Sequence, residues 1–265
     1  MESLTLLSGC TMPVVGLGTW PLKGQQCKHV IKKALELGYT HFDTAWIYKN
    51  QREIGEALRE AGADRSQLFI TSKIGKDYLQ YEVALKQADE ILRHLRMDYV
   101  DLLLVHWPSE TVPMEETMSA FNEIFNAGKA RSIGVSNFSV EQMKRARSLS
   151  ATPISVNQIK YHPGYEQRDI LQWCLRNNVV VTAYSPLGKK NILQHPLLLQ
   201  IARIHHKTPA HVALKWLIQK GMVIIPKASS RAHLQANLDV FEWSLSQNEM
   251  QSIDRIAGSG THQEL

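Results

Sequence analysis

Eight short apolar runs recur along the chain, each followed by a longer stretch that mixes apolar and charged residues. The runs occupy residues 14–18, 40–45, 68–74, 100–107, 131–136, 154–160, 179–185 and 223–226. A β-strand with its crossover helix needs roughly 30 residues, and eight units in 265 residues average about 33 residues each. This arithmetic predicts parallel strands closed into a (β/α)8 TIM barrel, with residues 1–265 forming a single domain.

The stretches between the runs have the apolar spacing of helices that bury one face. Helices are expected at 30–38, 53–62, 83–95 and 118–129, and further helices are expected to begin after Ser139 and Thr208. Gly38 and Gly62 stand where helices commonly end in a left-handed residue. Ser139 with Gln142 three residues later fits a capping box, and Pro209 suits a first helical turn.

An open, doubly wound sheet is the main alternative fold, because it also alternates strands with helices. Its dinucleotide fingerprint, GxGxxG after a strand, is missing, since GLGTWP at 16–21 lacks the last glycine. The first residues, LTLLSGCTMPVV, have the pattern of a β-hairpin with its turn at Ser8 and Gly9. We therefore expect a barrel whose floor is capped by an N-terminal β-hairpin.

Composition argues against several classes of protein. No apolar stretch reaches the roughly 18 residues of a membrane helix, and the first residues lack the basic region of a secretory signal. Cys10, Cys27 and Cys174 are odd in number and widely spaced, which indicates reduced thiols and a cytoplasmic location. The adjacent His205 and His206 cannot share one helix face, and no CxxC or HExxH spacing occurs, so no metal is expected.

The net charge of +5 comes from scattered lysines and arginines. A nucleic-acid-binding surface would need a basic stripe with interleaved aromatic residues, and the sequence has none. The charge fits attraction of a small polyanion better. We expect a small-molecule partner, no nucleic acid, no membrane and a monomeric protein.

Asp43, Tyr48, Lys73 and His106 lie at or just beyond the ends of three successive apolar runs. The gaps are 30 residues from Asp43 to Lys73 and 33 residues from Lys73 to His106. Adjacent parallel strands direct their carboxyl ends to the same rim of a barrel, which is where such folds place their active sites. The spacing therefore predicts one reaction centre with an acid, a phenol, an ammonium group and an imidazole.

Eight short motifs stand at the predicted strand ends, in one order along nearly the whole chain. They are GLGTW (16–20), FDTAWIY (42–48), TSK (71–73), VHWP (105–108), GVSNF (134–138), NQ (157–158), YSPLG (184–188) and IPK (225–227). Together they resemble the aldo-keto reductase superfamily, and in particular its short microbial members of the diketogluconate reductase type. The resemblance implies an NADP-dependent oxidoreductase that reduces carbonyl groups.

The resemblance also implies a role for each matching residue. Tyr48 matches the proton donor, Asp43 and Lys73 its supporting pair, and His106 the group that orients the substrate carbonyl. The implied substrate-binding residues are Trp20, Ile47, Tyr48, His106 and Trp107. The implied cofactor-binding residues are Gly18, Thr19, Trp20, Asp43, Ser136, Asn137, Gln158, Tyr184, Ser185, Pro186, Leu187, Gly188, Lys227, Ser229, Ser230, Arg231, His233 and Asn237.

One departure from the family pattern concerns the choice of cofactor. Many members carry an arginine six residues after the lysine of the IPK motif, where this chain has His233, and Arg231 lies two residues earlier. NADPH is therefore the expected cofactor, with NADH as a weaker alternative.

The chemistry explains why such a site needs these residue types. A carbonyl reduction needs a hydride at carbon, which a nicotinamide supplies, and a proton at oxygen. A tyrosine has a pKa of about 10, and the ammonium of Lys73, held by Asp43, is expected to lower the pKa of Tyr48. A neutral His106 would donate an N–H to the carbonyl oxygen as negative charge develops there.

The loops after His106 and Tyr184 and the tail after Ile256 are short compared with those of the family's longer members. We expect an open, permissive pocket that takes small aldehydes, dicarbonyls and keto-sugars, and fast exchange of the cofactor. Two alternatives stay open at this point. Lys73 or Lys227 at a barrel-strand end would suit a Schiff-base lyase, and the same barrel would serve as a non-catalytic NADPH sensor.

Overall fold

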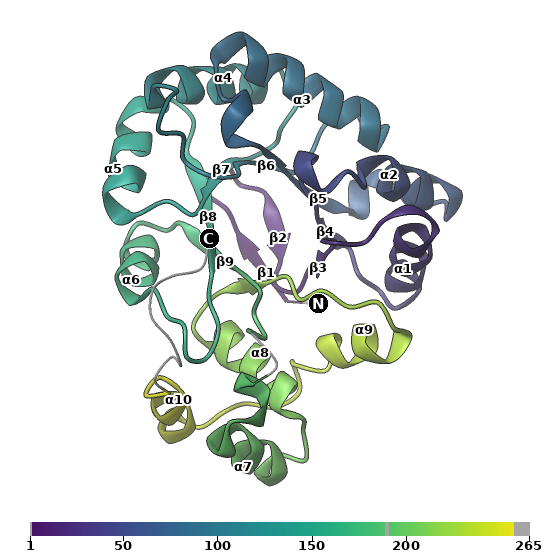
Figure 1. Ribbon diagram of the computed structural model, residues 1–265, viewed down its shortest axis with the longest axis vertical. Helices are drawn as coiled ribbons and strands as arrows, with labels where there is room; N and C mark the ends of the chain where they lie inside the picture. Colours follow the sequence, from purple (N-terminus) through teal and green to yellow (C-terminus); the bar gives the residue numbers. More distant parts are fainter. Residues whose placement is uncertain (1, 189–190, 257–265) are drawn as a thin grey trace.

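Eight parallel strands form the wall of a barrel in the computed structural model, which describes residues 2–188 and 191–256 (Figure 1). The strands are β3 (Leu17–Gly18), β4 (His41–Asp43), β5 (Phe69–Ile74), β6 (Leu102–Val105), β7 (Ile133–Ser136), β8 (Ile154–Lys160), β9 (Val180–Tyr184) and β10 (Val223–Ile224). They pair in chain order. The seam is closed because Gly16 donates its N–H to Ile224 O at 2.8 Å, while Ile224 N donates to Val14 O at 2.8 Å. The predicted (β/α)8 barrel is therefore confirmed.

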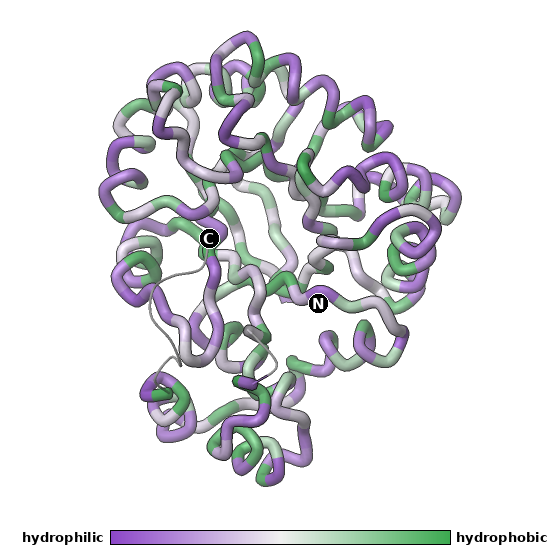
Figure 2. The backbone as a smooth tube through the Cα atoms, in the orientation of Figure 1, coloured by the Kyte–Doolittle hydropathy of each residue, from purple (hydrophilic) through white to green (hydrophobic). Residues whose placement is uncertain are grey.

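Ten helices surround the strands (Figure 1) in the described part of the chain. They are α1 (Gly24–Glu36), α2 (Gln51–Glu60), α3 (Tyr81–Leu95), α4 (Met114–Asn126), α5 (Val140–Leu149), α6 (Arg168–Arg176), α7 (Pro196–Ile204), α8 (Pro209–Gln219), α9 (Arg231–Leu238) and α10 (Gln247–Ile253). Apolar positions alternate with hydrophilic ones along these helices (Figure 2). None of them is long and apolar enough to cross a membrane.

The predicted helix signals are present in the structure. Gly38 and Gly62 follow α1 and α2 with φ of 91° and 65°, a conformation that costs a glycine little. Ser139 accepts a hydrogen bond from Gln142 N, and Gln142 returns one to Ser139 N, which completes the capping box at α5. Helices α6, α7, α9 and α10 have no specific expectation in the sequence analysis.

The N-terminal hairpin closes one end of the barrel. Strands β1 (Ser3–Thr5) and β2 (Thr11–Pro13) pair antiparallel, and Gly9 takes φ of 86° in the turn between them. Leu6 and Met12 pack against residues that point into the barrel from β5, β6, β8 and β10. The predicted hairpin cap on the barrel floor is confirmed, and the opposite, carboxyl-terminal end of the strands is left for a site.

Candidate active site

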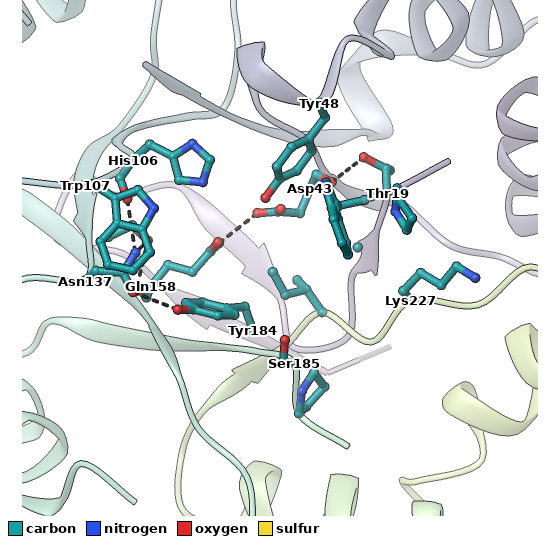
Figure 3. Close-up of a pocket in the computed structure, with 16 residues that line it drawn as sticks. Thr19, Asp43, Tyr48, His106, Trp107, Asn137, Gln158, Tyr184, Ser185 and Lys227 are labelled. Atoms are coloured by element: carbon teal, nitrogen blue, oxygen red, sulfur yellow. Dashed lines mark hydrogen bonds between the residues drawn. The ribbon is translucent and has the colours of Figure 1, made fainter. Parts of the chain in front are cut away.

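A cavity of about 440 Å³ opens at the carboxyl ends of the strands (Figure 3). The sequence predicts most of its lining, and Pro21 and Ile225 are additions from the structure. The predicted residues that line it are Gly18, Thr19, Trp20, Asp43, Tyr48, His106, Trp107, Ser136, Asn137, Gln158, Tyr184, Ser185, Pro186 and Lys227. The structure thus brings together motifs that are up to about 200 residues apart in the chain.

Asp43, which lines the cavity, forms a buried ion pair with Lys73, which lies behind the lining. Asp43 ends β4, and its Oδ1 accepts a hydrogen bond of 2.5 Å from Nζ of Lys73 on β5. The same ammonium donates to Thr44 O at 2.8 Å, and the side chain of Lys73 is fully buried. Burial lowers the pKa of Lys73, but the charges and hydrogen bonds of Asp43 and Tyr48 together outweigh burial and raise the pKa above its usual value. Lys73 therefore stays protonated.

Tyr48 ends the short 3-10 helix η1 (Trp46–Tyr48), which follows β4 and turns the phenol toward the cavity (Figure 3). The ammonium of Lys73 lies 5.1 Å from the centre of its ring. Burial raises the pKa of Tyr48 above its usual value, while the charge of Lys73 lowers it. The lowered pKa expected from the sequence is wrong: Lys73 acts in the expected direction, but burial is the larger effect. The phenol is therefore protonated at neutral pH.

His106 follows β6 and faces Tyr48 across the cavity. The two ring centres are 5.8 Å apart, with the ring planes at 77°. Burial, followed by the charge of Lys73, lowers the pKa of His106 to about 3. The imidazole is thus neutral at physiological pH, with one N–H to donate. Its Nδ1 is buried and has no hydrogen-bond partner within residues 2–188 and 191–256.

A group of amides and hydroxyls lines the wall formed by β7, β8 and β9. Asn137 donates to Ser136 Oγ at 3.0 Å and accepts a hydrogen bond of 3.0 Å from the hydroxyl of Tyr184. Gln158 on β8 donates from Nε2 to Oδ2 of Asp43 at 2.8 Å. These side chains hold one another in place beside Asp43.

Large apolar side chains surround the mouth of the cavity. Trp20 is 62% exposed and Trp107 is 41% exposed, and both line the cavity. Ile47 is 51% exposed and lies outside the cavity lining. Substrates would meet an apolar rim before they reach the polar interior.

Lys227 lies where the chain runs from β10 to α9. Its Nζ is 3.4 Å from Ser229 Oγ, and both residues are exposed or half-buried. Ser230 caps α9 by accepting a hydrogen bond of 3.2 Å from His233 N. A cation and hydroxyl groups thus gather at the start of a helix, where backbone N–H groups favour anions.

Other residues of the predicted cofactor region do not line the cavity. Arg231 pairs with Glu36 of α1 at 3.0 Å, and Asn237 is only 6% exposed. Gly188 has φ of 57° and packs against the ring of His162, where a Cβ atom would lie 2.8 Å from Nδ1. Leu187, Gly188 and these α9 residues lie outside the cavity lining. Lys189, Lys190 and the tail 257–265 lie outside the described residues.

Comparison with known proteins identifies the family. The profile of the Aldo/keto reductase family matches residues 14–257. The chain belongs to the aldo/keto reductase family. It is therefore an oxidoreductase that acts on carbonyl groups, and the resemblance inferred from the motifs is confirmed.

Individual relatives of this aldo-keto reductase match over nearly their whole length. Glyoxal reductase of Bacillus subtilis (strain 168) is 36% identical over 256 residues, which cover 96% of this chain and 92% of that protein. The 9,11-endoperoxide prostaglandin H2 reductase of Trypanosoma cruzi (strain CL Brener) is 36% identical over 258 residues, with coverage of 96% and 90%. The crystal structure of a putative 2,5-diketo-D-gluconic acid reductase B is 38% identical with a TM-score of 0.92, covering 98% of this chain and 92% of that chain.

Asn50 is a further structural residue of this reductase that no sequence motif predicts. The side chain is fully buried and donates to Thr19 O at 3.2 Å and to Leu22 O at 3.1 Å, while Thr44 Oγ1 donates to it at 2.7 Å. It thereby ties the loop that carries Trp20 to the end of β4. An asparagine just before a helix is a signal for an N-cap, but Asn50 makes no such cap, so that signal would have been misread.

Proposed function

We propose that this aldo-keto reductase uses NADPH to reduce small aldehydes, dicarbonyls and keto-sugars to alcohols, with Tyr48 as the proton donor. One observation carries the proposal: a protonated phenol and a neutral imidazole line one cavity, and a buried ammonium lies beside the phenol. Few other reactions need these three groups in one place. The names of the relatives, which include a glyoxal reductase and a putative diketogluconic acid reductase, agree with this substrate range.

The source of the proton is inferred from the electrostatics of Tyr48, His106 and Lys73. In the proposed reaction, the substrate carbonyl oxygen lies between the hydroxyl of Tyr48 and the ring of His106. His106 donates its N–H to the oxygen as negative charge develops, and Tyr48 delivers its proton. Lys73 stabilises the phenolate that remains, and Asp43 keeps Lys73 charged and in place.

The wall opposite Tyr48 fits a nicotinamide, which supplies the hydride when it is bound. Ser136, Asn137 and Gln158 present hydroxyl and amide groups that can bind a carboxamide, and Tyr184 presents a ring to stack on. Gly18 leaves bare backbone at the seam, because a Cβ atom there would lie 2.6 Å from Ile225 O. The residues present therefore fit this cofactor.

Preference for NADPH over NADH is proposed to depend on the region before α9. Lys227 and Ser229 offer a cation and a hydroxyl for a phosphate, and Ser230 lies next to them. Arg231 is held by Glu36, which reduces its contribution. NADH is expected to bind, but more weakly.

The width of the substrate range follows from the open mouth. Trp20 and Trp107 are exposed walls rather than parts of an enclosed pocket. A pocket discriminates between substrates through enclosing contacts, and the described part of the mouth offers few. We therefore propose a permissive site, and fast release of the cofactor for the same reason.

Two alternative functions fit the geometry less well. A Schiff base needs a neutral amine that reaches the substrate, whereas Lys73 is buried behind the cavity wall and its pKa is raised. A non-catalytic sensor would have no need for the phenol, the ammonium and the imidazole together. Neither alternative has an observation in its favour.

We also propose that the enzyme acts as a cytoplasmic monomer. The thiols of Cys27 and Cys174 are buried, and burial raises the pKa of each to about 12, so they stay protonated and unreactive. Such thiols suit a reducing compartment. Light scattering of the purified protein would check the monomer.

The test of the function is NADPH consumption with a panel of carbonyls: methylglyoxal, a nitrobenzaldehyde, a keto-sugar and a quinone. We expect turnover of several of them at comparable kcat/KM. One substrate that exceeds all others by several orders of magnitude would contradict the permissive site. Tight NADPH binding without turnover of any carbonyl would contradict the enzymatic role itself.

Tyr48→Phe is the matched control for this panel. The variant removes one hydroxyl and keeps the ring, so NADPH affinity measured by fluorescence should stay as in the wild type. Turnover should fall by about 10²–10⁴-fold, the usual contribution of a positioned acid. Unchanged turnover would remove Tyr48 from the reaction.

A further inference from the structure

The two carboxylate oxygens of Asp43 have different partners. Oδ1 accepts from the ammonium of Lys73 at 2.5 Å. Oδ2 accepts from the side-chain amide of Gln158 at 2.8 Å (Figure 3). All three side chains are buried. Gln158 lines the cavity, whereas Lys73 lies behind its wall, so Asp43 joins the two.

The backbone of Gln158 is firmly held, which fixes the origin of its side chain. Gln158 O accepts hydrogen bonds from Asn137 N at 2.9 Å and from Ser136 Oγ at 2.8 Å. In the sheet, Gln158 is paired with Ser136 on one side and Thr182 on the other. Its amide therefore reaches Asp43 from a rigid position in the barrel wall.

A donor on Oδ2 changes what Oδ1 does. An ionised carboxylate is acceptor-only, and each N–H that it binds withdraws part of its negative charge. With Gln158 bound to Oδ2, the carboxylate of Asp43 attracts the ammonium of Lys73 less strongly and neutralises less of its positive charge. Without that donor, Oδ1 would draw the ammonium more strongly toward itself and away from Tyr48.

Lys73 is the cation that acts on the phenol. The groups that face Tyr48 are Lys73, Asp43, His106 and Tyr184, and His41 lies beneath the Asp43–Lys73 pair. The pKa of His106 is lowered to about 3 and that of His41 to about 4, so both are neutral at physiological pH. Any change in the Asp43–Lys73 contact is therefore felt at Tyr48 without compensation from a second cation.

We propose that Gln158 is a positioning residue for proton transfer, which holds Asp43 through Oδ2 so that Lys73 remains available to the phenolate of Tyr48. A side-chain amide carries two N–H groups, so one can stay on Asp43 while the other faces the cavity. Gln158 thereby links the amide-binding wall to the proton donor. This inference rests on the reductase function proposed above.

The test replaces Gln158 with methionine, which has a similar length and no donor. Carbonyl reduction should fall at alkaline pH as Tyr48 loses its proton. In Gln158→Met this fall should move up by about one pH unit, and kcat should decrease by about three- to tenfold, because a weaker acid donates more slowly. Gln158→Asn, whose shorter amide cannot span the distance to Asp43, should do the same and serves if the methionine variant folds poorly.

A second measurement needs neither cofactor nor turnover. The tyrosinate absorbance of the free protein is titrated for Gln158→Met and for the wild type, each with and without Tyr48→Phe. The difference within each pair reports Tyr48 alone, and its midpoint should be higher in Gln158→Met. This measurement keeps its meaning even if the wild type reduces no carbonyl, in which case the proposed function fails and the link between Gln158 and Tyr48 is still tested.

Ser136→Ala is the matched control. Ser136 lines the same cavity and binds the backbone of Gln158, but it makes no contact with Asp43. This variant should weaken NADPH binding. The midpoint of the alkaline fall in activity and the midpoint of the Tyr48 titration should both stay as in the wild type. If Gln158→Met behaves like Ser136→Ala, with weaker NADPH binding and unmoved midpoints, Gln158 serves the cofactor alone and the inference is wrong.

Discussion

At the scale of single residues, the site depends on where charge is left without compensation. Lys73 is fully buried, and Asp43 and Thr44 O hold its ammonium in place, so its charge acts on the neighbouring rings of Tyr48 and His106. Removing one partner of such a buried pair strands the other charge at a cost of several kcal/mol. Lys227 is the opposite case: it is exposed, and Ser229 is its hydrogen-bond partner among the described residues. Lys73 is thus enclosed beside Tyr48, whereas Lys227 is exposed in the cavity lining.

The exposed Lys227 gives a prediction about cofactor choice. Lys227→Ala should weaken NADPH by about tenfold or more and leave NADH nearly unchanged, because a charged hydrogen bond to a phosphate is worth about 1.5–3 kcal/mol. Fluorescence titration with each cofactor measures this. Arg231→Ala is the matched control, and it should have a smaller effect, since Glu36 already holds the guanidinium. An equal loss of NADPH and NADH in Lys227→Ala would count against the phosphate contact.

Residue types at strand ends could be predicted from sequence, but the bonds between them could not. The spacing of Asp43, Lys73 and His106 is enough to bring them to one rim once the strands are parallel. The bond from Gln158 to Asp43 joins residues 115 apart in the chain, and it depends on the register of every strand between them. The balance of burial against charge at Tyr48 depends on packing that no local pattern encodes.

At the scale of elements, the connection from β4 to α2 contains two residues that shape the mouth of the cavity. It contains η1, which presents Tyr48, and it ends at Asn50, which binds the loop after β3. The helices with strong apolar periodicity were predictable, as α1 to α4 illustrate. The connection itself was not, because Asn50 acts through carbonyl groups of Thr19 and Leu22 that no side-chain pattern reveals.

Asn50 therefore gives a prediction at this scale. Asn50→Ala removes the partner of Thr44 Oγ1 and of Leu22 O, while Thr19 O still accepts from Leu22 N at 2.7 Å. Each unsatisfied group costs about 1–3 kcal/mol. We expect a loss of about 3 kcal/mol in the free energy of unfolding, measured in urea. The loop that carries Trp20 should also loosen, so KM for carbonyls should rise by about three- to tenfold, with a smaller change in kcat.

Gln51→Met separates this effect from general destabilisation. Gln51 is the neighbouring buried amide, and it donates at 2.7 Å to Ser72 Oγ on the side of β5 away from the cavity. Its replacement should lower stability while KM stays as in the wild type. A matching rise of KM in both variants would mean that Asn50 has no specific role at the mouth.

At the scale of the whole molecule, His41 connects the floor of the barrel to its reaction centre. It is fully buried, with Nδ1 3.2 Å from Pro13 O of the hairpin and Nε2 3.3 Å from Thr71 Oγ1 of β5. Burial lowers its pKa from 6.5 to about 4. The position leaves no room for a hydration shell, since the ring also packs edge-on against Phe69.

This buried imidazole makes stability depend on pH. In the unfolded chain His41 is protonated below about pH 6.5, whereas in the folded barrel it is protonated only below about pH 4. Protonation therefore favours the unfolded state, and His41 alone should lower the free energy of unfolding by about 3 kcal/mol between these two values. Its contribution is fully present above pH 6.5 and is lost as the pH falls toward 4. Urea unfolding at a series of pH values measures the slope.

His41→Asn isolates this term from the other histidines. The amide keeps a donor toward Pro13 O, but the variant loses the packing of the ring and should be less stable at pH 7. Because it has no imidazole to protonate, its free energy of unfolding should fall by about 3 kcal/mol less than that of the wild type between pH 7 and pH 4. Where the variant is too unstable to study, the histidine resonances of the wild type provide the same test, since the imidazole of His41, like that of His106, should remain neutral down to about pH 4. An imidazole at His41 that titrates near 6.5 in the folded protein would show that water reaches the barrel interior, and the floor would then not seal the reaction centre from below.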